Sequence, residues 1–298
     1  MSKKILIIGA SGALAIALSK LLIAETDHSL YYLTSKDIKI SDDESRFIKA
    51  HPLEVKNVKN FCFNILPDVI INCSGLSDVV LAENERKLAW DLNVRVVENL
   101  VNISKILDSH LVLISSDLVF DGMKGPYYDD TKPNPLNYYG KTKHTAENIS
   151  LTTLKKITVV RTTPFYGLPF SEHNTFLDDY IYKLYRNYWV NASDFLFTNP
   201  CFIDDLTLTI MKLIDRELFG VFNTGGPDWL SHYDFAVKVA DIFDFNKKLI
   251  HKIKNPFEGA RMPLKAGLVT LKTETNLSIK FTPLENGLTA CKFRYFDK

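Results

Sequence analysis

The sequence has few cysteines, and none of them is spaced as part of a metal site or a redox pair. Cys62, Cys73, Cys201 and Cys291 are scattered without a C-x-x-C motif, and two of them lie in apolar runs. The seven histidines are dispersed as well, and no two of them are four residues apart. We therefore expect no metal site and a reducing, cytoplasmic compartment.

An excess of one charge and long apolar runs are also missing. Lys and Arg number 36 against 35 acidic residues, so no strong field attracts nucleic acid or an acidic membrane surface. The opening MSKKILIIGASGALAIALSKLLIA has the basic start and apolar residues of a secretory signal, but Lys20 interrupts it, and no apolar run is long enough to cross a bilayer. A small molecule is therefore the expected partner, with neither nucleic acid nor a membrane involved.

What the sequence does contain is an alternation of short apolar runs with helical patterns. Between the runs lie segments such as 82–107, in which apolar residues recur with helical spacing. Strands that are apolar throughout and separated by helices are typical of a parallel sheet covered on both faces. We predict an α/β fold with a doubly wound, Rossmann-type parallel sheet. The predicted strands are 4–9, 29–34, 68–73, 110–116 and 157–162.

The alternation loosens after about residue 165. Short strands in FLFTNPCFIDD and GVFNTGG lie among helices expected at 175–190, 204–216 and 231–244, and Ser231 is placed to cap the last of these. We predict a dinucleotide-binding domain at 1–165 and a smaller α/β substrate-binding lobe at 166–298. No linker separates them, so the boundary is soft and elements can interleave across it.

The turn GASGALA follows the first predicted strand and opens an amphipathic helix. Glycines at this point let the backbone approach a pyrophosphate, and the helix N-terminus supplies unpaired N–H groups. A strand-to-helix turn can also need glycine for backbone reasons alone, but its context in an α/β chain favours a nucleotide site. The residues expected at the cofactor here are Gly9, Ser11, Gly12, Ala13 and Leu14.

The second predicted strand ends in LTSK, without the acidic residue that would bind a ribose 2′-hydroxyl. Ser35 and Lys36 could instead contact a 2′-phosphate, which favours NADP(H) and leaves NAD(H) as the alternative. The other interpretation of Lys36 is a solvated loop residue.

A serine, a tyrosine and a lysine form a candidate catalytic group. Ser115 and Ser116 end the predicted strand 110–116, and Tyr139 and Lys143 share one face of the helix that follows. A carbonyl that accepts a hydride must also receive a proton. A tyrosine next to a lysine ammonium can exchange that proton, because the positive charge lowers the pKa of the phenol. The pattern therefore indicates hydride transfer, with a serine hydroxyl orienting the substrate oxygen.

At this point the chain resembles an extended short-chain dehydrogenase/reductase, most closely the dTDP-4-dehydrorhamnose reductase family. The specific motifs are SSDLVFDG and PNPLNYYGKTK, supported by DVIINCSG, VVRTTPFYG, TNPCFIDDL and ARMPLKAGL along nearly the whole chain. By position, the resemblance implies Ser116 as the catalytic hydroxyl, beside Tyr139 and Lys143. It also implies that Cys73, Ser74 and Gly75 pack against the cofactor.

The implied activity is NAD(P)H-dependent reduction of the 4-keto group of a nucleotide-activated deoxysugar, for a surface polysaccharide precursor. The expected substrate contacts are Ser116, Asp117, Asn199 and Arg261, while Arg161 is either a substrate contact or half of a structural salt bridge. Leu118 and Pro164 replace an aromatic residue and a tryptophan that the family often has on the substrate side. The identity of the sugar and its nucleotide therefore stays open.

Two other functions remain as alternatives. One is a nucleotide-sugar epimerase that retains NAD, because one fold hosts several reactions. The other is a noncatalytic NADP-binding regulatory subunit that docks on an enzyme, as some relatives in this family are. The intact Ser116, Tyr139 and Lys143 favour catalysis. Homodimer formation is left open by the sequence.

Overall fold

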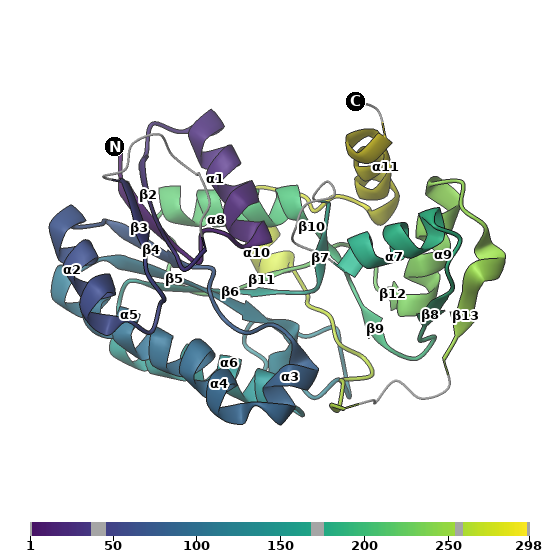
Figure 1. The fold of residues 1–298 in the computed structure, drawn as a ribbon, viewed down its shortest axis with the longest axis horizontal. Helices are drawn as coiled ribbons and strands as arrows, with labels where there is room; N and C mark the ends of the chain where they lie inside the picture. The colour runs from purple at the N-terminus through teal and green to yellow at the C-terminus, as the bar shows by residue number, and fades with distance from the viewer. Residues whose placement is uncertain (1, 37–45, 168–175, 254–258, 297–298) are drawn as a thin grey trace.

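The computed structural model describes residues 2–36, 46–167, 176–253 and 259–296 (Figure 1). Its centre is a seven-stranded sheet in the order β11-β6-β5-β4-β1-β2-β3, and every neighbouring pair in it is parallel. The strands are β1 (Lys4–Ile8), β2 (Ser29–Thr34), β3 (Phe47–Lys49), β4 (Val69–Asn72), β5 (His110–Ser116), β6 (Ile157–Thr162) and β11 (Gly220–Thr224). The doubly wound α/β fold predicted from the apolar runs is confirmed.

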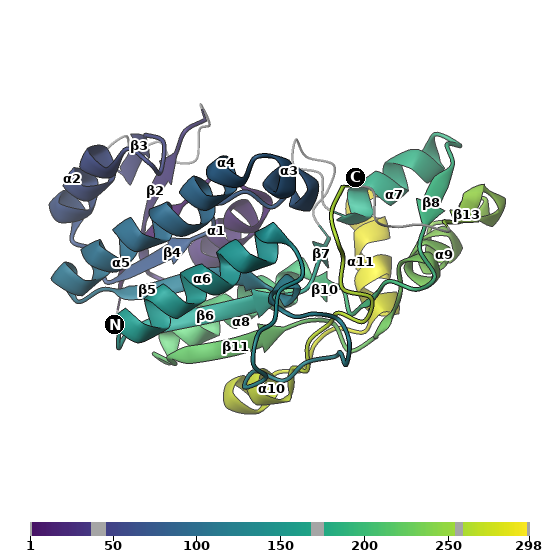
Figure 2. The same cartoon turned by 90° about the horizontal axis from the view of Figure 1, so that it is seen from below.

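Each central strand buries both of its faces, which explains why the runs are apolar throughout. Ile5 and Ile7 of β1 pack into one hydrophobic core, whereas Leu6 and Ile8 pack into another on the opposite side of the sheet. The first core is covered by α1 (Ala13–Glu25), α8 (Ile203–Asp215) and α10 (Leu271–Leu277). The second is covered by α2 (Val55–Ile65), α5 (Val96–Leu107) and α6 (Tyr138–Thr153), as Figure 2 shows.

The helical pattern at 82–107 is not one regular helix, as the sequence had suggested. It comprises α3 (Val79–Asn84), α4 (Arg86–Trp90), a π-helical turn (Asp91–Arg95) and α5. The helical spacing of apolar residues continues through the π-helical turn, so the periodicity of the sequence alone did not reveal the turn. The π-helical turn brings Asn93 into the protein interior, where its side chain has hydrogen-bonding partners described below.

The second lobe has a hydrophobic core of its own, beside the carboxyl ends of the sheet strands (Figure 1). Its helices are α7 (Phe176–Tyr185), α9 (His232–Ile242) and α11 (Leu284–Phe296). Its strands pair as β7 (Phe165–Tyr166) with β10 (Cys201–Phe202), β9 (Phe197–Thr198) with β12 (Leu230–Ser231), and β8 (Val190–Ala192) with β13 (Ile250–Lys252). Ser231 caps α9 as predicted, since its hydroxyl accepts a hydrogen bond from the Asp234 N–H at 3.0 Å.

Some elements beyond residue 165 lie in the first lobe. Strand β11 pairs with β6 at the edge of the sheet, and α8 packs beside α1 in the same core. The chain therefore crosses between the lobes several times, and segments from beyond residue 165 complete the first lobe.

The four cysteines, which are all among the described residues, are free. Within the described part of the chain, no helix is long and apolar enough to cross a bilayer, and no group of acidic, histidine and cysteine side chains could hold a metal ion.

Candidate active site

The glycine turn between β1 and α1 brings two segments of backbone into close contact. Gly9 has a φ of +76°, and a Cβ at this position would lie 2.8 Å from the Ser74 Cα. The Gly12 N–H donates to the Gly9 carbonyl at 2.9 Å, and Gly12 caps α1 without a side-chain hydrogen bond. Only glycine fits at Gly9, and the bare N-terminus of α1 can hold a pyrophosphate.

The turn forms part of a cavity of about 700 Å³ at the carboxyl ends of the central strands. This is where ligands bind in open α/β sheets. Ten of the residues predicted from the sequence line it: Gly12, Ala13, Leu14, Cys73, Ser74, Gly75, Ser116, Asp117, Tyr139 and Lys143. The second lobe supplies the opposite wall, so the cavity lies between the two lobes.

Ser116, Tyr139 and Lys143 lie together in this cavity. Ser116 is the last residue of β5, and its hydroxyl accepts a hydrogen bond from the Leu118 N–H at 3.2 Å. That hydroxyl also shares a hydrogen bond with the Tyr139 phenol. The Lys143 Nζ donates to the Ile114 carbonyl at 3.0 Å and lies 5.8 Å from the centroid of the Tyr139 ring. A serine, a phenol and an amine thus face one space beside the glycine turn.

The structure corrects one expectation about Tyr139. Burial raises the pKa of its phenol, the Asp117 charge raises it further, and the hydrogen bond with Ser116 only partly opposes both effects. Burial lowers the pKa of Lys143 to about 8, with Glu147 and Cys73 partly offsetting the effect. Tyr139 is therefore a neutral phenol at neutral pH, which is the form that donates a proton.

Asp117 is a buried carboxyl group next to this pair. Burial raises its pKa to about 6, although hydrogen bonds with Ser116, Thr198 and the Gly267 backbone limit the rise. The Ser116 and Thr198 hydroxyls each donate to one of its carboxylate oxygens at 3.3 Å. Asp117 thus links Ser116 to the second lobe through Thr198.

Asn93 is a site residue that the sequence reasoning missed. Its side-chain oxygen accepts from the Leu76 N–H at 2.8 Å, and its amide donates to the Leu76 carbonyl at 3.1 Å and to the Thr142 hydroxyl at 3.0 Å. Asn93 therefore fastens the loop after β4 to the helix that carries Tyr139. The available signal was a polar residue at the helical spacing of the apolar residues Ala89, Val96, Val97 and Leu100.

Ser115 and Arg161 belong to a buried ion pair and lie outside the catalytic group. The Arg161 guanidinium binds both carboxylate oxygens of Glu147, at 2.8 and 3.0 Å, and donates to the Asp129 carbonyl at 3.0 Å. The Ser115 hydroxyl donates to the same carboxylate at 2.5 Å. Of the two alternatives for Arg161, the structure supports the structural salt bridge.

Asn199 has a structural role that replaces the expected substrate contact. Its amide donates to the carbonyls of Gly226 and Leu268, at 2.7 and 2.9 Å, and its oxygen accepts from the Leu268 N–H at 2.9 Å. These bonds use both amide hydrogens and one lone pair of the oxygen, so the side chain holds three segments of the chain together.

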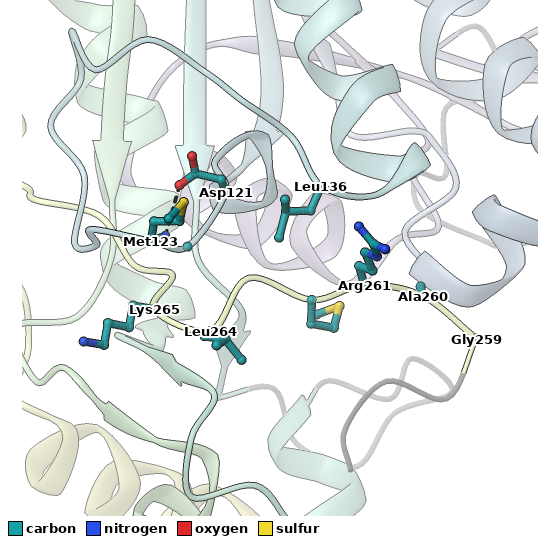
Figure 3. Close-up of a pocket in the computed structure, with 10 residues that line it drawn as sticks. Asp121, Met123, Leu136, Gly259, Ala260, Arg261, Leu264 and Lys265 are labelled. Atoms are coloured by element: carbon teal, nitrogen blue, oxygen red, sulfur yellow. Dashed lines mark hydrogen bonds between the residues drawn. The ribbon is translucent and has the colours of Figure 1, made fainter.

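Arg261 lines a second cavity, of about 860 Å³, beside the segment 259–265 (Figure 3). Figure 3 shows Arg261 and Lys265 on this segment, with Leu136 and Met123 on the neighbouring loops. Met262 lines both cavities. The expected contact between Arg261 and substrate therefore requires a ligand that extends past Met262.

Ser11, Ser35 and Lys36 lie at the end of the site nearest β2. The Thr34 hydroxyl donates to the Ser11 hydroxyl at 3.0 Å and accepts from the Lys36 N–H at 3.2 Å. Ser35 and Lys36 are exposed. Their side chains are thus accessible to a cofactor phosphate, and the preference for NADP(H) stays a prediction of the sequence.

The chain is similar to known proteins over most of its length. A model of the family described as RmlD substrate binding domain matches residues 3–295. Methionine adenosyltransferase 2 subunit beta of Xenopus laevis is 30% identical over 267 residues, covering 87% of this chain and 78% of that protein. The dTDP-4-dehydrorhamnose reductase of Aggregatibacter actinomycetemcomitans is 27% identical over 249 residues, covering 80% of this chain and 78% of that protein. The crystal structure of dTDP-4-dehydrorhamnose reductase from Bacillus anthracis in complex with NADP matches with a TM-score of 0.85 and 25% identity, covering 100% of this chain and 99% of the other.

Proposed function

The chain belongs to the RmlD substrate binding domain family, and from this membership we propose that it reduces the 4-keto group of a nucleotide-activated deoxysugar with NADPH. The resemblance predicted from the sequence motifs is confirmed by the family match. The observation that carries the proposed reaction is the grouping of Ser116, Tyr139 and Lys143 in the cavity that also contains the glycine turn. A related enzyme, the dTDP-4-dehydrorhamnose reductase of Bacillus anthracis, binds NADP.

The residues on the first-lobe side of the cavity fit a dinucleotide. Gly75 has a φ of +139°, and a Cβ there would lie 2.7 Å from the Asn93 side-chain oxygen and 3.8 Å from the Lys143 Nζ, so only glycine fits where this loop packs against Asn93. We infer that the α1 N-terminus holds the pyrophosphate and that Lys143 holds the nicotinamide ribose. NADP(H) is the favoured cofactor and NAD(H) the alternative. When bound, the reduced cofactor supplies the hydride.

The protein's own residues supply the proton and orient the keto group of the substrate. Tyr139, held as a neutral phenol, donates its proton to the substrate keto oxygen as the carbonyl carbon becomes a CH–OH group. The Ser116 hydroxyl hydrogen-bonds the same oxygen and fixes its position next to the phenol. Lys143, as a cation, stabilises the phenolate that remains until it is reprotonated.

Leu118 and Pro164 line the cavity on the substrate side, where they replace the larger residues frequent in the family. The sugar-binding space therefore differs in shape from that of relatives with aromatic residues there. We further infer that the product is a precursor for a surface polysaccharide, made in the cytoplasm.

The first test is loss of NADPH absorbance on mixing the protein with a panel of nucleotide-linked 4-keto-6-deoxy sugars, with NADH in parallel. Consumption with one sugar identifies the reaction, the substrate and the cofactor together.

Replacing Tyr139 with phenylalanine should lower kcat by about 10² to 10⁴, because the proton donor is lost. Tyr138→Phe is the matched control, since that ring packs against Arg86 outside the cavity and should leave kcat unchanged. Full turnover by Tyr139→Phe would refute the assignment of the donor.

A second candidate function comes from the similarity to methionine adenosyltransferase 2 subunit beta. On this reading the chain docks on a methionine adenosyltransferase and binds NADP without turning over a sugar. Co-purification with that enzyme, together with NADPH binding and no consumption across the sugar panel, would favour it. An epimerase would instead keep NAD bound through purification. Denaturing the purified protein would then release NAD, and the absorbance spectrum of the supernatant would detect it.

A further inference from the structure

The two lobes line the active-site cavity with side chains of different polarity. The first lobe contributes the reactive group of Ser116, Tyr139 and Lys143 together with the glycine turn. A ligand between the lobes therefore has a polar side and an apolar side. The apolar wall on the second-lobe side is formed by Leu196, Phe197, Met262, Pro263 and Ala266.

Among the described residues of this wall, two side chains are polar, and both are engaged within the protein. The Thr198 hydroxyl donates to one oxygen of the Asp117 carboxylate at 3.3 Å, and the Ser116 hydroxyl donates to the other. His232 also has an interaction within the protein. Burial lowers the pKa of its ring to about 4, so the wall carries no positive charge at pH 7.

The hydroxyl groups on the other sides of the cavity are committed to partners as well. Among the described residues that line it, the exceptions are the exposed Ser77 and the group of Ser116 and Tyr139, which the proposed reaction uses. The other hydroxyls donate to acceptors within the protein at 2.5 to 2.9 Å: Ser74 to the Asn72 side chain, Ser115 to Glu147, Thr162 to the Thr163 carbonyl, and Thr163 to the Asn199 carbonyl.

The proposed reaction fixes how a sugar lies in this cavity. The keto group must reach Tyr139 and Ser116, and the hydride comes from the nicotinamide on the first-lobe side, next to Lys143. The ring face turned away from the nicotinamide therefore packs against the apolar wall. A ring hydroxyl on that side gives up its hydrogen bonds to water and gains no side-chain partner from the wall, which weakens binding.

We propose that the substrate is a nucleotide-linked 4-keto dideoxyhexose, which lacks a ring hydroxyl at C2 or C3 in addition to the one at C6. The apolar wall selects this sugar over the 6-deoxyhexose that keeps both ring hydroxyls. The inference rests on the proposed function, because it takes the keto group to lie at Tyr139. The same wall disfavours sugars with a charged substituent, since the charge would be buried without a partner.

The test compares substrates that differ by one hydroxyl group. The value of kcat/KM with NADPH is measured for a dTDP-linked 4-keto-6-deoxyhexose and for its 2,6-dideoxy and 3,6-dideoxy counterparts. We expect one of the dideoxy sugars to have the higher kcat/KM by about 10- to 100-fold, because the wall leaves the extra hydroxyl unpaired.

Met262→Gln tests whether the wall is the source of this preference. Met262 lines the cavity and is partly exposed, and glutamine has a similar length but brings a donor and an acceptor. The variant should reduce the preference for the dideoxy sugar by about tenfold. Met123→Gln is the matched control, because Met123 is 74% exposed and lies outside the residues that line this cavity. It should keep the wild-type preference.

An equal or higher kcat/KM for the 6-deoxyhexose would overturn the inference and leave the proposed function intact. A preference for the dideoxy sugar that Met262→Gln does not change would overturn the role given to the wall. If Met262→Gln does not fold, the comparison of substrates on the wild type decides.

Reduction of none of the keto sugars would refute the proposed function itself. Calorimetric titration of the NADP-saturated protein with the corresponding 4-hydroxy nucleotide sugars then decides the inference. Binding of a dideoxy sugar about 10- to 100-fold tighter than that of the 6-deoxyhexose would support it, whereas equal binding or no binding would overturn it.

Discussion

At the scale of single residues, Asp117 is a buried carboxyl group whose ionisation opposes folding. Its pKa is about 6 in the folded protein, against about 4 in an unfolded chain. The folded state therefore binds the proton more tightly. Stability falls as the pH rises from about 4 to about 6, and the cost, about 3 kcal/mol, persists at higher pH.

Asp117→Asn removes that cost, because the amide stays neutral. We expect the variant to be more stable than the wild type by about 1 to 3 kcal/mol at pH 7.5, with the difference shrinking towards zero near pH 4. Urea unfolding of both proteins at the two pH values measures this. A variant that is less stable at pH 7.5 would mean that the hydrogen bonds to Asp117 outweigh its desolvation.

The grouping of Ser116, Tyr139 and Lys143 in one cavity could be predicted from sequence, because hydride-transfer chemistry would constrain these residues to a short pattern. Tyr139 and Lys143 lie four residues apart on one helix, and Ser116 is the last residue of strand β5. Asn199 and Arg161 could not be assigned in this way. A polar side chain that serves the fold looks the same in sequence as one that serves a ligand, and only its hydrogen-bond partners distinguish the two.

At the scale of elements, the two glycines of the turn between β1 and α1 have different roles: Gly9 allows the backbone conformation, and Gly12 leaves space at the N-terminus of α1. Gly9→Ala should destabilise the protein by about 1 to 3 kcal/mol, because φ is +76° there and the new methyl would meet the Ser74 backbone. Gly12→Ala should fold nearly as well, since its nearest contact would be the Gly9 carbonyl at 3.3 Å. That methyl would crowd the N-terminus of α1 and should weaken NADP binding by about tenfold or more, roughly 1.4 kcal/mol.

Urea unfolding without cofactor and NADP titration together separate these effects. Equal losses of stability in the two variants would show that both glycines serve only the backbone turn.

The Glu147–Arg161 ion pair joins α6 to β6, and Ser115 ties it to β5. Glu147→Gln leaves the arginine charge buried without its carboxylate, so we expect a loss of about 3 to 5 kcal/mol in the free energy of unfolding. Lys183→Met breaks the exposed pair with Asp179, which has the same 2.8 Å separation, and should cost less than about 1 kcal/mol. Chemical denaturation of both variants compares them, and similar costs would contradict the argument from burial.

The longer strands and helices were predictable because apolar runs and helical spacing reflect burial directly. The predicted strand at 110–116 matches β5, and the helix expected at 204–216 matches α8 within one residue. Strand β3, with only three residues, was not predicted, because a partly exposed run of that length carries no periodic signal. The segment 220–224 was predicted as a strand, but sequence could not show that its partner is β6.

At the scale of the whole molecule, the sheet is incomplete without the second half of the chain. Leu206, Ile210 and Leu213 of α8 are fully buried in the core that α1 also covers. We expect a fragment of residues 1–165 not to fold cooperatively, because it lacks β11 and the helix that closes this core. Circular dichroism during heating should show one sharp transition for the full chain and none for the fragment. A cooperative transition in the fragment would show that the first six strands carry an independent core.

The pairing of β6 with β11 also determines the order in which this protein can be completed on the ribosome. Strand β6 is synthesised by residue 162, but its outer neighbour is not available until residue 224 has left the exit tunnel. Throughout that interval the nascent chain presents an apolar strand edge, which can pair with other chains. Molecular chaperones that bind extended apolar segments would therefore act on this protein late in translation, after Ser116, Tyr139 and Lys143 have been made and before the sheet beside them is closed.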